Sequence, residues 1–424
     1  MKKLKLAIKG GSKSARIEGK HYTWPKITKA TKRAILKQLD SGPISIYYRE
    51  GVVAKFEDQF KNYHQRKYGL VCNSGTSALH SCFVGIGLRE GDEVIAPAYT
   101  FFATVTPVLF TGAVPILVDA KEDGNIDPQL INKAITRKTK AIIVTHMWGI
   151  PCDMDEITRI VKENNLFLIE DCSHAHGATY KGKLAGTFGH TSAWSLQGQK
   201  IITGGECGIM LTDDEEIYYR ANLLGHFNKR CKQEIPLNHP LHKFWITGMG
   251  LKYRAHPLAV AMATEQFSHL TRWLKRKREV AKYMDRKFKN IPGIQIPLRD
   301  SFKKPSWYAY ILQYKGEQLS NLPIEKFFTA LKAEGLEALD RPESTQPLNL
   351  LPLFQTPGEL FPGYKGKFSY KKGQFPVAEH FFEKALKLPV WIDNKAEKII
   401  DQYAKAFWKV VDNYKELLKN DNRR

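Results

Sequence analysis

Three short segments of the chain combine residue types that can do chemistry together. In the first, from Asn73 to Leu79, the turn Gly75-Thr76-Ser77 precedes a helix-like run. The free N–H groups of such a helix start, with two hydroxyls beside them, form a ready binding site for a phosphate. A plain helix cap uses the same residue types, because Ser and Thr are favoured at that position. The segment alone leaves both interpretations open.

The second segment carries a carboxylate at the end of an apolar run. Asp171 directly follows the predicted strand 167–170, so its side chain is expected in a semi-buried place where it can hold a cation or a protonated ring nitrogen. His174 and His176 follow closely and suggest a metal. No third ligand has a suitable spacing, and we therefore expect no metal site.

The third segment contains a lysine in unusual surroundings. Lys200 lies between an apolar run that ends at Ser195 and the glycine-rich turn 203–208. Removal from water lowers the pKa of a lysine and frees its amine for Schiff-base chemistry. The chain has many lysines, so this segment is weak evidence by itself.

Together the three segments fit pyridoxal phosphate. That cofactor needs a lysine for its aldehyde, a carboxylate for its pyridine nitrogen and a cradle for its phosphate. The aromatic residues Tyr99, Phe101 and Phe102 offer surfaces for stacking on the ring. Ordinary core packing is the alternative interpretation of these aromatic side chains.

The surrounding sequence predicts the elements that position these segments. Short apolar runs alternate with helix-like stretches, which indicates an α/β fold with a mostly parallel central sheet flanked by helices. The predicted strands are 93–96, 114–118, 141–144, 167–170 and 209–211. Ligands in such sheets bind at the carboxyl ends of the strands, where His146, Asp171 and Ser195 are expected.

The pattern changes after residue 255. An apolar-faced helix is predicted over 257–274, a strand over 306–315 and an amphipathic helix over 394–419, whereas 340–378 is rich in Pro, Gly and aromatic residues without a regular period. We predict a large domain of residues 1–275 that binds the cofactor, and a smaller α+β domain of residues 276–424.

Charge, cysteine spacing and hydrophobicity limit the class of protein and its location. The 424 residues include 65 Lys and Arg against 43 Asp and Glu, a formal charge of +22. Basic residues are spread along the chain without a zinc-finger, KH, RRM or basic-zipper signature, so the charge alone does not decide between nucleic acid and a small anion as partner. None of the six cysteines forms a C-x-x-C pair, which favours reduced, buried thiols. No run is apolar enough for a membrane span and the basic N-terminus lacks a secretory core, so we expect a cytoplasmic protein.

The ordered motifs resemble the DegT/DnrJ/EryC1/StrS family of sugar aminotransferases, fold-type I enzymes that depend on pyridoxal phosphate. The resemblance rests on SGTSAL (74–79), GDEVIAPAYTFFAT (91–104), EDCSHAHGA (170–178), SLQGQKIITGGECG (195–208) and GLKYRAHPLA (250–259). Each piece is weak alone, but the ordered set is specific and covers most of the chain.

The resemblance also implies roles for single residues. By position, Lys200 is similar to the Schiff-base lysine and Asp171 to the partner of the pyridine nitrogen. Thr76, Ser77 and Ser195 match the phosphate contacts, Phe101 the aromatic over the ring and His174 the residue beside it. The family brings a second subunit to the phosphate through an Asn, which is Lys252 here, near Arg254. A homodimer is therefore implied.

The implied reaction moves an amino group from glutamate or glutamine to the ketone of a sugar, usually a nucleotide-linked one. The N-terminal residues and the block 144–157 look like the subgroup that acts on cyclitol (inosose) or aminoshikimate-type ketones, which carry no nucleotide. A non-catalytic regulatory or nucleic-acid-binding protein is a second alternative, which the charge of +22 supports slightly and the pair of Lys200 and Asp171 opposes. The acceptor stays open at this point.

Overall fold

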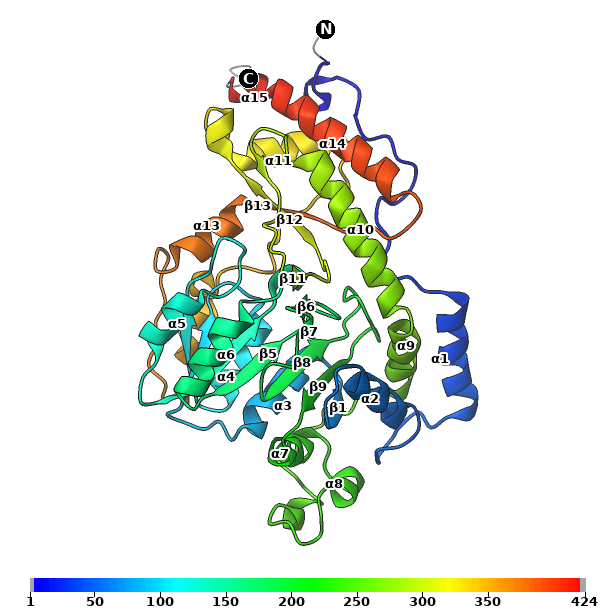
Figure 1. The fold of residues 1–424 in the computed structure, drawn as a ribbon, viewed down its shortest axis with the longest axis vertical. Coiled ribbons are helices and arrows are strands. Elements are labelled where there is room, and N and C mark those ends of the chain that lie inside the picture. The colour runs from blue at the N-terminus through cyan, green and yellow to red at the C-terminus, as the bar shows by residue number, and fades with distance from the viewer. Residues whose placement is uncertain (1–3, 420–424) are drawn as a thin grey trace.

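The computed structural model describes residues 4–419, which are built around one central sheet (Figure 1). Its seven strands, in spatial order, are β1 (Tyr68–Cys72), β9 (Gly208–Thr212), β8 (Thr191–Ser195), β5 (Phe167–Asp171), β4 (Thr139–Thr145), β2 (Glu93–Pro97) and β3 (Val114–Val118). The strands from β8 to β3 run parallel, and β9 is antiparallel to both of its neighbours. The predicted α/β class is confirmed, as are the five predicted strands. The sequence patterns did not identify β1, and they indicated β8 only by the apolar run that ends at Ser195.

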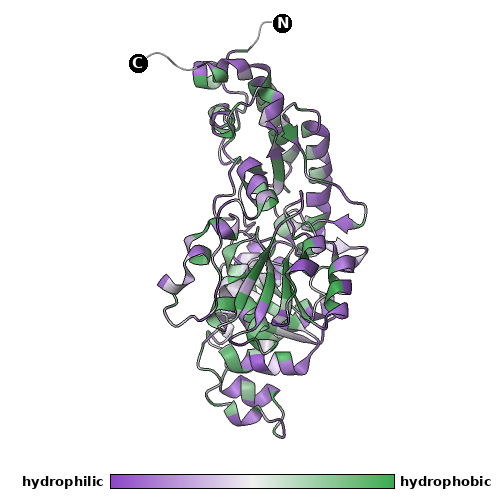
Figure 2. Cartoon of the chain, turned by 90° about the vertical axis from the view of Figure 1, so that its left-hand side faces the viewer, coloured by the Kyte–Doolittle hydropathy of each residue, from purple (hydrophilic) through white to green (hydrophobic). Residues whose placement is uncertain are grey.

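Helices cover both faces of the sheet because successive side chains of a strand point to opposite faces. One face packs against α3 (Gly75–Gly85), α4 (Thr106–Phe110) and α7 (Glu215–Gly225). The other face packs against α2 (Gly51–Tyr63), α5 (Pro128–Ala134), α6 (Met154–Glu163) and α9 (Pro257–Phe267). Figure 2 shows these apolar strands enclosed by helices whose outward turns are hydrophilic.

A smaller unit lies at one end of the molecule, at the top of Figure 1. Its antiparallel sheet contains β10 (Ile294–Gln295), β12 (Tyr310–Tyr314) and β13 (Ala385–Leu388). It packs with α10 (Leu270–Phe288), α11 (Ile324–Ala333), α14 (Ala396–Asp412) and α15 (Tyr414–Leu418). A third small sheet, of β11 (Lys303–Lys304), β6 (Thr179–Tyr180) and β7 (Lys183–Leu184), lies between this unit and the central sheet in Figure 1.

Two predicted helices are interrupted in the structure. The stretch 257–274 divides into α9 and α10, because the hydroxyl of Ser268 donates a hydrogen bond to the carbonyl oxygen of Glu265 and the chain turns there. The stretch 394–419 divides at Asn413, whose side-chain amide donates to the carbonyl oxygen of Lys409. Side chains that compete for backbone partners explain both breaks.

The irregular segment 340–378 covers the open edge of the central sheet. It contains the short helix α12 (Pro352–Gln355) between the 3-10 helices η6 (Leu348–Leu350) and η7 (Pro357–Glu359), and it leads into α13 (Pro376–Lys384). The hydroxyl of Tyr370 donates to the carbonyl oxygen of Pro115 (2.9 Å) and accepts from the N–H of Leu117 (3.0 Å), both on edge strand β3. The aromatic residues of this segment thereby satisfy backbone groups of an edge that is otherwise open to a further strand.

The boundary proposed at residue 275 falls inside α10 and stays a prediction. Apolar packing does not follow chain order here. Leu6 and Ala15 lie in the hydrophobic cluster of the smaller unit, and Phe354 and Ala378 lie in a cluster of the central sheet. The N-terminal segment is held there by Glu334, whose carboxylate accepts from the N–H groups of Ala7 (2.7 Å) and Ser14 (3.0 Å).

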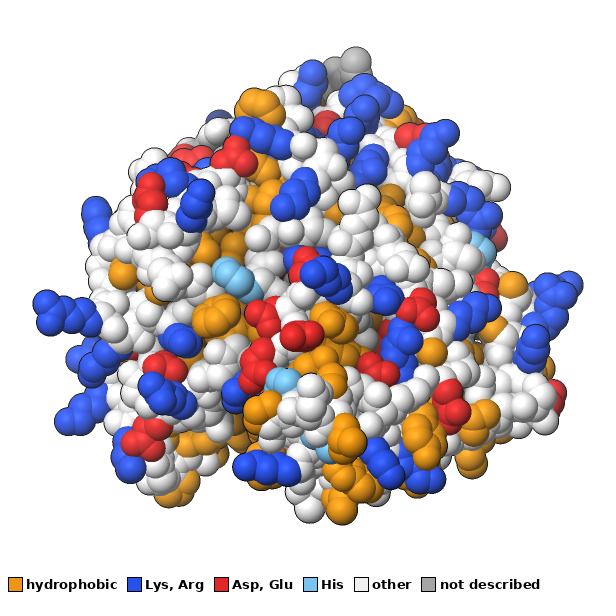
Figure 3. All heavy atoms as spheres, turned by 60° about the horizontal axis from the view of Figure 1, so that its bottom comes forward, with side chains coloured by type: hydrophobic (Ala, Val, Ile, Leu, Met, Phe, Trp, Pro, Cys, Tyr) orange, Lys and Arg blue, Asp and Glu red, His pale blue; other side chains and the backbone are white. Residues whose placement is uncertain are grey.

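The remaining helices lie on the outside. α1 (Lys29–Ser41) packs on α9, and α8 (Lys229–Glu234) lies at the lower end of the molecule in Figure 1. Figure 3 views that lower end and shows Lys and Arg side chains spread around the whole face rather than gathered in one patch. Within residues 4–419, no helix has the length and hydrophobicity that a membrane span requires.

Candidate active site

The carboxyl ends of β4, β5 and β8 border a cavity of about 380 Å³ that the smaller unit helps to close. This is the position at which open α/β sheets bind ligands. Of the predicted site residues, the wall contains Gly75, Thr76, Phe101, Asp171, His174, Ser195 and Lys200. The structure therefore brings together seven of the ten residues predicted from sequence, over a span of 126 positions in the chain.

The start of α3 forms one side of the cavity. Ser74 caps the helix, since its hydroxyl accepts from the N–H of Ser77 (3.0 Å). The hydroxyl of Ser77 donates to the side-chain oxygen of Asn73 (2.6 Å), which keeps it in the cap and off the cavity wall. Ser74, which the sequence analysis did not select, lines the cavity beside Gly75 and Thr76. The helix start thus presents free N–H groups and hydroxyls to an anion.

Gly75 is required by close packing. A Cβ atom at this position would lie 2.6 Å from the Cβ atom of Ser195, which is the last residue of β8. The glycine therefore lets the start of α3 approach the end of β8 so that hydroxyls from both elements face the same space. Such a cradle suits the phosphate of pyridoxal phosphate.

Asp171, at the end of β5, is buried and its orientation is fixed by two donors. Its Oδ2 accepts from the hydroxyl of Thr104 (2.7 Å), and its Oδ1 accepts from the N–H of Ser173 (3.0 Å). Thr104 belongs to a buried hydroxyl network with Thr100 and Thr145. The sequence analysis missed Thr104, although it is the final residue of the motif at 91–104.

Lys200 follows β8 across a turn, and its amine lies in the cavity. Desolvation lowers the pKa of Lys200 to about 8, while the negative charge of Asp171 acts in the opposite direction. Its Nζ lies 4.8 Å from the centre of the Tyr308 ring. A lysine with a lowered pKa is neutral in a larger fraction of molecules at neutral pH, which is the form that attacks an aldehyde.

Three stacked rings form a further wall of the cavity. The rings of His174 and Tyr308 are nearly parallel, at 7° and 4.0 Å between centres, and Trp148 stacks on His174 at 5.5 Å. Burial and the nearby Lys200 charge lower the pKa of His174 well below its usual range, so this imidazole is neutral. Its Nδ1 is buried without a hydrogen-bond partner in the described part of the chain. Phe101 also lines the cavity, and its side chain is exposed.

Pyridoxal phosphate fits this set of groups. The unpartnered Nδ1 of His174 and the glycine at the start of α3 are features that a bound ring and phosphate would explain, and Asp171 and Lys200 have the chemistry that the group needs.

The smaller unit contributes two residues that the sequence analysis missed. Tyr308 lies within the strand predicted over 306–315, and nothing in its sequence neighbourhood distinguishes it from a core aromatic. Lys387 lies on β13, lines the cavity and forms an ion pair of 2.7 Å with Asp340. Lys387 lies on β13 and Tyr308 lies two residues before β12, and these two strands pair with each other.

Lys252 and Arg254 lie outside the cavity of their own chain. The guanidinium of Arg254 lies 4.5 Å from the centre of the Tyr47 ring. The neighbouring Tyr253 accepts a hydrogen bond from the N–H of Asn73 (2.7 Å), so this segment packs directly against the start of the phosphate cradle. The role predicted for these cations through a second subunit stays a prediction.

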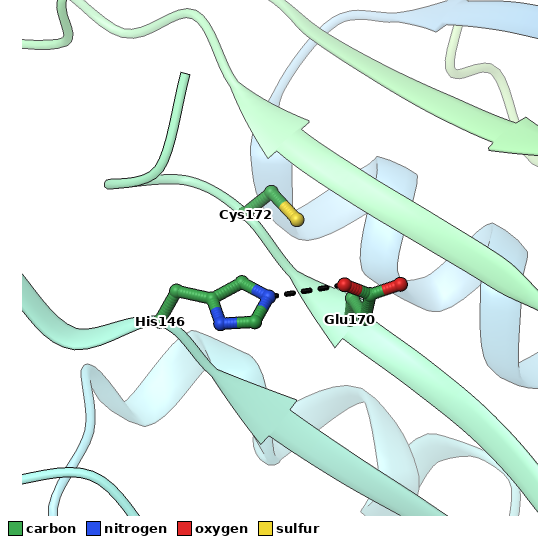
Figure 4. A group of neighbouring side chains, drawn as sticks. All are labelled: His146, Glu170 and Cys172. Atoms are coloured by element: carbon green, nitrogen blue, oxygen red, sulfur yellow. Dashed lines mark hydrogen bonds and ion pairs between the residues drawn. The ribbon is translucent and has the colours of Figure 1, made fainter. Parts of the chain in front are cut away.

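A buried group of His146, Glu170 and Cys172 lies behind the site (Figure 4). The carboxylate of Glu170 accepts from the N–H groups of Gly186, Phe188 and Gly189 and from Nε2 of His146 (3.1 Å). Nδ1 of His146 accepts from the N–H of Cys152, so Nε2 carries the proton. Burial and nearby acidic groups raise the pKa of the Cys172 thiol well above its usual range. Since N–H donors occupy the carboxylate, we interpret this cluster as a support for the strand end that carries Asp171.

Comparison with known proteins gives the same picture. The model of the DegT/DnrJ/EryC1/StrS aminotransferase family matches residues 25–403. A GDP-perosamine synthase of Escherichia coli O157:H7 is 35% identical over 299 residues, which are 70% of this chain and 79% of that protein. An L-glutamine:scyllo-inosose aminotransferase of Streptomyces griseus is 28% identical over 97% of this chain and 99% of its own. The X-ray structure of an aminotransferase from Psychrobacter cryohalolentis superimposes with a TM-score of 0.80 at 27% identity, covering 92% of this chain and 99% of that one.

Proposed function

Since this chain belongs to the DegT/DnrJ/EryC1/StrS family of pyridoxal-phosphate-dependent aminotransferases, we propose that it transfers an amino group from glutamate or glutamine to the ketone of a nucleotide-linked sugar. The observation that carries the catalytic part is the placement of Lys200, with its lowered pKa, in one cavity with the buried carboxylate of Asp171 and the start of α3. A cytoplasmic location stays a prediction from the sequence.

We assign roles to seven residues of the site. The bound cofactor supplies an aldehyde for the lysine and a ring that takes up electrons during amino transfer. The amine of Lys200 holds the cofactor and carries the proton between the substrate carbon and the cofactor. Asp171 keeps the pyridine nitrogen protonated, and Thr104 and the N–H of Ser173 hold this carboxylate in place. Thr76 and Ser195 bind the phosphate, with Ser74 in the place that Ser77 was expected to take.

Lys387 supports a donor with a carboxylate group. Apart from Lys200, it is the one lysine or arginine on the part of the cavity wall that residues 4–419 form. Its present partner, Asp340, is more than half exposed, so their ion pair is worth little and can be exchanged for a substrate anion. A carboxylate bound by Lys387 would place the amino acid between the smaller unit and Lys200.

Two classes of acceptor have support. The perosamine synthase relative is named for a nucleotide-linked sugar product, and the Streptomyces griseus relative, which matches almost the whole chain, is named for scyllo-inosose. Segment 226–243 contains four lysine and arginine residues that could bind the diphosphate of a nucleotide-linked sugar, but they do not form a single anion site. Arg230 is buried and paired with Glu57, and Lys229 and Lys232 lie over aromatic rings. A cyclitol or aminoshikimate-type ketone is therefore the second candidate.

A homodimer completes the proposed site. The segment that precedes Lys252 exposes Leu237, Phe244, Ile246 and Met249, a set of apolar side chains that a second copy of the chain would cover. Lys252 of the partner subunit would then supply a cation to the phosphate.

The acceptor can be identified from the second half of the reaction. The holoenzyme is converted to its aminated form with glutamate or glutamine, freed of donor and mixed with nucleotide-linked keto-sugars, free keto-sugars or inososes. Return of the aldehyde spectrum identifies the acceptor. Return with inososes alone would replace the nucleotide-sugar proposal, and no return with any ketone would contradict both.

The role of Lys387 is tested in the first half-reaction, in which the amino donor reacts. Lys387→Met should raise the donor KM about 10- to 100-fold, since hydrogen bonds to charged groups are worth about 1.5–3 kcal/mol. The acceptor half-reaction should keep its rate. Lys367→Met, at an exposed lysine, serves as the matched control.

A further inference from the structure

Lys277 is a fully buried lysine on α10, on the side of the helix that faces the segments next to the active site. Its side chain is 1% exposed, and its Nζ donates to the carbonyl oxygens of Trp307 (3.1 Å) and Val390 (3.2 Å). Other buried cations have carboxylate partners: Arg230 pairs with Glu57. Within residues 4–419 we find no carboxylate paired with Lys277, and burial lowers its pKa to about 7. Burial of an ammonium group without a counter-ion costs free energy, so a function of Lys277 other than stabilising the fold is worth examining.

The first carbonyl that Lys277 holds belongs to an unusual piece of backbone. Trp307 has φ = 57°, in the left-handed region that bulky side chains rarely adopt. The next residue, Tyr308, donates its N–H to the carbonyl oxygen of Trp148 (3.1 Å), which is also left-handed at φ = 55°. Residues are kept in such conformations only where their surroundings determine them, and they concentrate at functional sites.

This backbone directs Tyr308 into the cavity. Its ring lies 4.0 Å from that of His174 and 4.8 Å from Nζ of Lys200. A different conformation at Trp307 would turn the Tyr308 ring away from both. The hydrogen bond from Lys277 to Trp307 therefore acts on the position of a ring that contacts the reacting amine.

Lys277 also contacts Trp24, which holds the backbone of Lys200. Its Nζ lies 5.4 Å from the centre of the Trp24 ring, and the indole N–H of Trp24 donates to the carbonyl oxygen of Lys200 (2.8 Å). Trp24 in turn packs edge-on against Trp273 of α10, at 5.2 Å. One side chain of α10 thus contacts both the group that holds the Lys200 backbone and the segment that places Tyr308.

We propose that Lys277 is a positioning residue, which holds the backbone at Lys200 and the ring of Tyr308 in a fixed relation by its hydrogen bonds to Trp307 and Val390 and its contact with Trp24. This inference rests on the proposed aminotransferase function, in which Lys200 carries the proton. It assigns the smaller unit a part in catalysis beyond closing the cavity.

The test compares Lys277→Met, which keeps an unbranched apolar side chain but donates no hydrogen bond, with Lys277→Gln, which has the same length as Met and still donates. In the holoenzyme we expect Lys277→Met to lower kcat about 10- to 100-fold, as small misplacements of reacting groups do, with both KM values within about threefold. Lys277→Gln should stay within about threefold of the parent in kcat. Lys275→Met, at an exposed position of the same helix, is the matched control.

A second readout does not depend on turnover. Deuterium uptake by the backbone at 306–308 should rise in Lys277→Met and stay unchanged in Lys275→Met. Without the hydrogen bond from Lys277, Trp307 is free to move, and the N–H of Tyr308 then separates from the carbonyl oxygen of Trp148. Parental kcat and uptake in a folded Lys277→Met protein would overturn the proposal, as would equal impairment of the Gln and Met variants. An inactive parent with increased uptake in Lys277→Met would instead contradict the proposed function and leave the positioning intact.

Trp24→Phe provides an independent test should Lys277→Met fail to fold. It removes the N–H that holds Lys200 and keeps an aromatic ring, so we expect kcat to fall about 10- to 100-fold, as in Lys277→Met. When it is combined with Lys277→Gln, the loss should stay within about threefold of that of Trp24→Phe alone. Parental kcat in Trp24→Phe would contradict the proposal.

Discussion

The indole N–H of Trp24 donates a 2.8 Å hydrogen bond to the carbonyl oxygen of Lys200, 176 positions further along the chain. The segment before α1 therefore takes part in holding the lysine of the active site. This contact lies behind Lys200, while Tyr308 lies at its amine and Asp171 opposes the loss of its charge. The position and charge of Lys200 thus depend on contacts with three separate parts of the chain.

Cofactor attachment should depend on pH through Lys200. Because desolvation lowers its pKa to about 8, the neutral, nucleophilic amine increases as the pH rises through that value. We expect the rate of attachment to the cofactor-free protein to rise from about pH 7 to about pH 9 and then to level off. Stopped-flow absorbance measures this rate. Lys200→Ala should show neither attachment nor turnover, and retained transamination in that variant would contradict the assignment.

Asp171→Asn should slow both half-reactions by about 10²- to 10⁴-fold, the range lost with a proton-holding group. An amide cannot keep the pyridine nitrogen protonated, although it occupies the same space. Thr104→Val leaves the Asp171 carboxylate in place and removes its donor to Oδ2, together with the Thr104 hydroxyl contacts to Thr100 and Thr145, and should cost about tenfold or less. Single-turnover absorbance separates the two variants. Equal rates for Asp171→Asn and the parent protein would exclude this role.

Gly75→Ala should weaken cofactor binding. The added methyl group would lie 2.6 Å from the Cβ atom of Ser195, so the start of α3 or the end of β8 must move. We expect the Kd for pyridoxal phosphate to rise by about tenfold or more, since the phosphate loses aligned N–H groups. Gly358→Ala, where nothing lies within 4 Å of the new Cβ, is the control. Unchanged affinity in Gly75→Ala would place the phosphate elsewhere.

Glu57→Gln should destabilise the fold strongly. Glu57 is completely buried and accepts two hydrogen bonds from Arg230, at 2.9 and 3.0 Å. Loss of its charge leaves a buried guanidinium without a counter-ion, for which we expect about 3–5 kcal/mol of unfolding free energy. The exposed pair Arg159–Glu163 is the comparison, and Glu163→Gln should cost about 1 kcal/mol or less. Denaturant unfolding with bound cofactor measures both, and similar losses would contradict the argument.

A shared site in a dimer predicts complementation between inactive subunits. Lys200→Ala removes the amine, and Lys252→Ala removes the cation that we assign to the neighbouring site. Refolding the two variants together creates dimers with one intact site, so activity should return above that of either variant alone. No recovery in mixed dimers, confirmed by mass, would exclude Lys252 from the partner's phosphate site.

The sequence alone was enough to predict the α/β fold, five strands of the central sheet and a cavity that contains Lys200, Asp171 and the start of α3. These residues follow strands or precede a helix in short, local motifs, and the carboxyl ends of parallel strands necessarily meet at one edge of a sheet. Their convergence therefore follows from chain order and strand direction.

Other features depend on contacts between distant segments, and only the tertiary structure decided them. Lys387 lies on β13 and Tyr308 just before its partner strand β12, and both line the cavity, whereas the hydroxyl of Ser77 donates a hydrogen bond to the side-chain oxygen of Asn73 and does not line it. Lys277 is one of several basic residues in its helix, and its sequence neighbours do not distinguish it. Its burial between Trp24, Trp307 and Val390 arises from packing against three separate segments, two of them more than a hundred positions away, which no local pattern encodes.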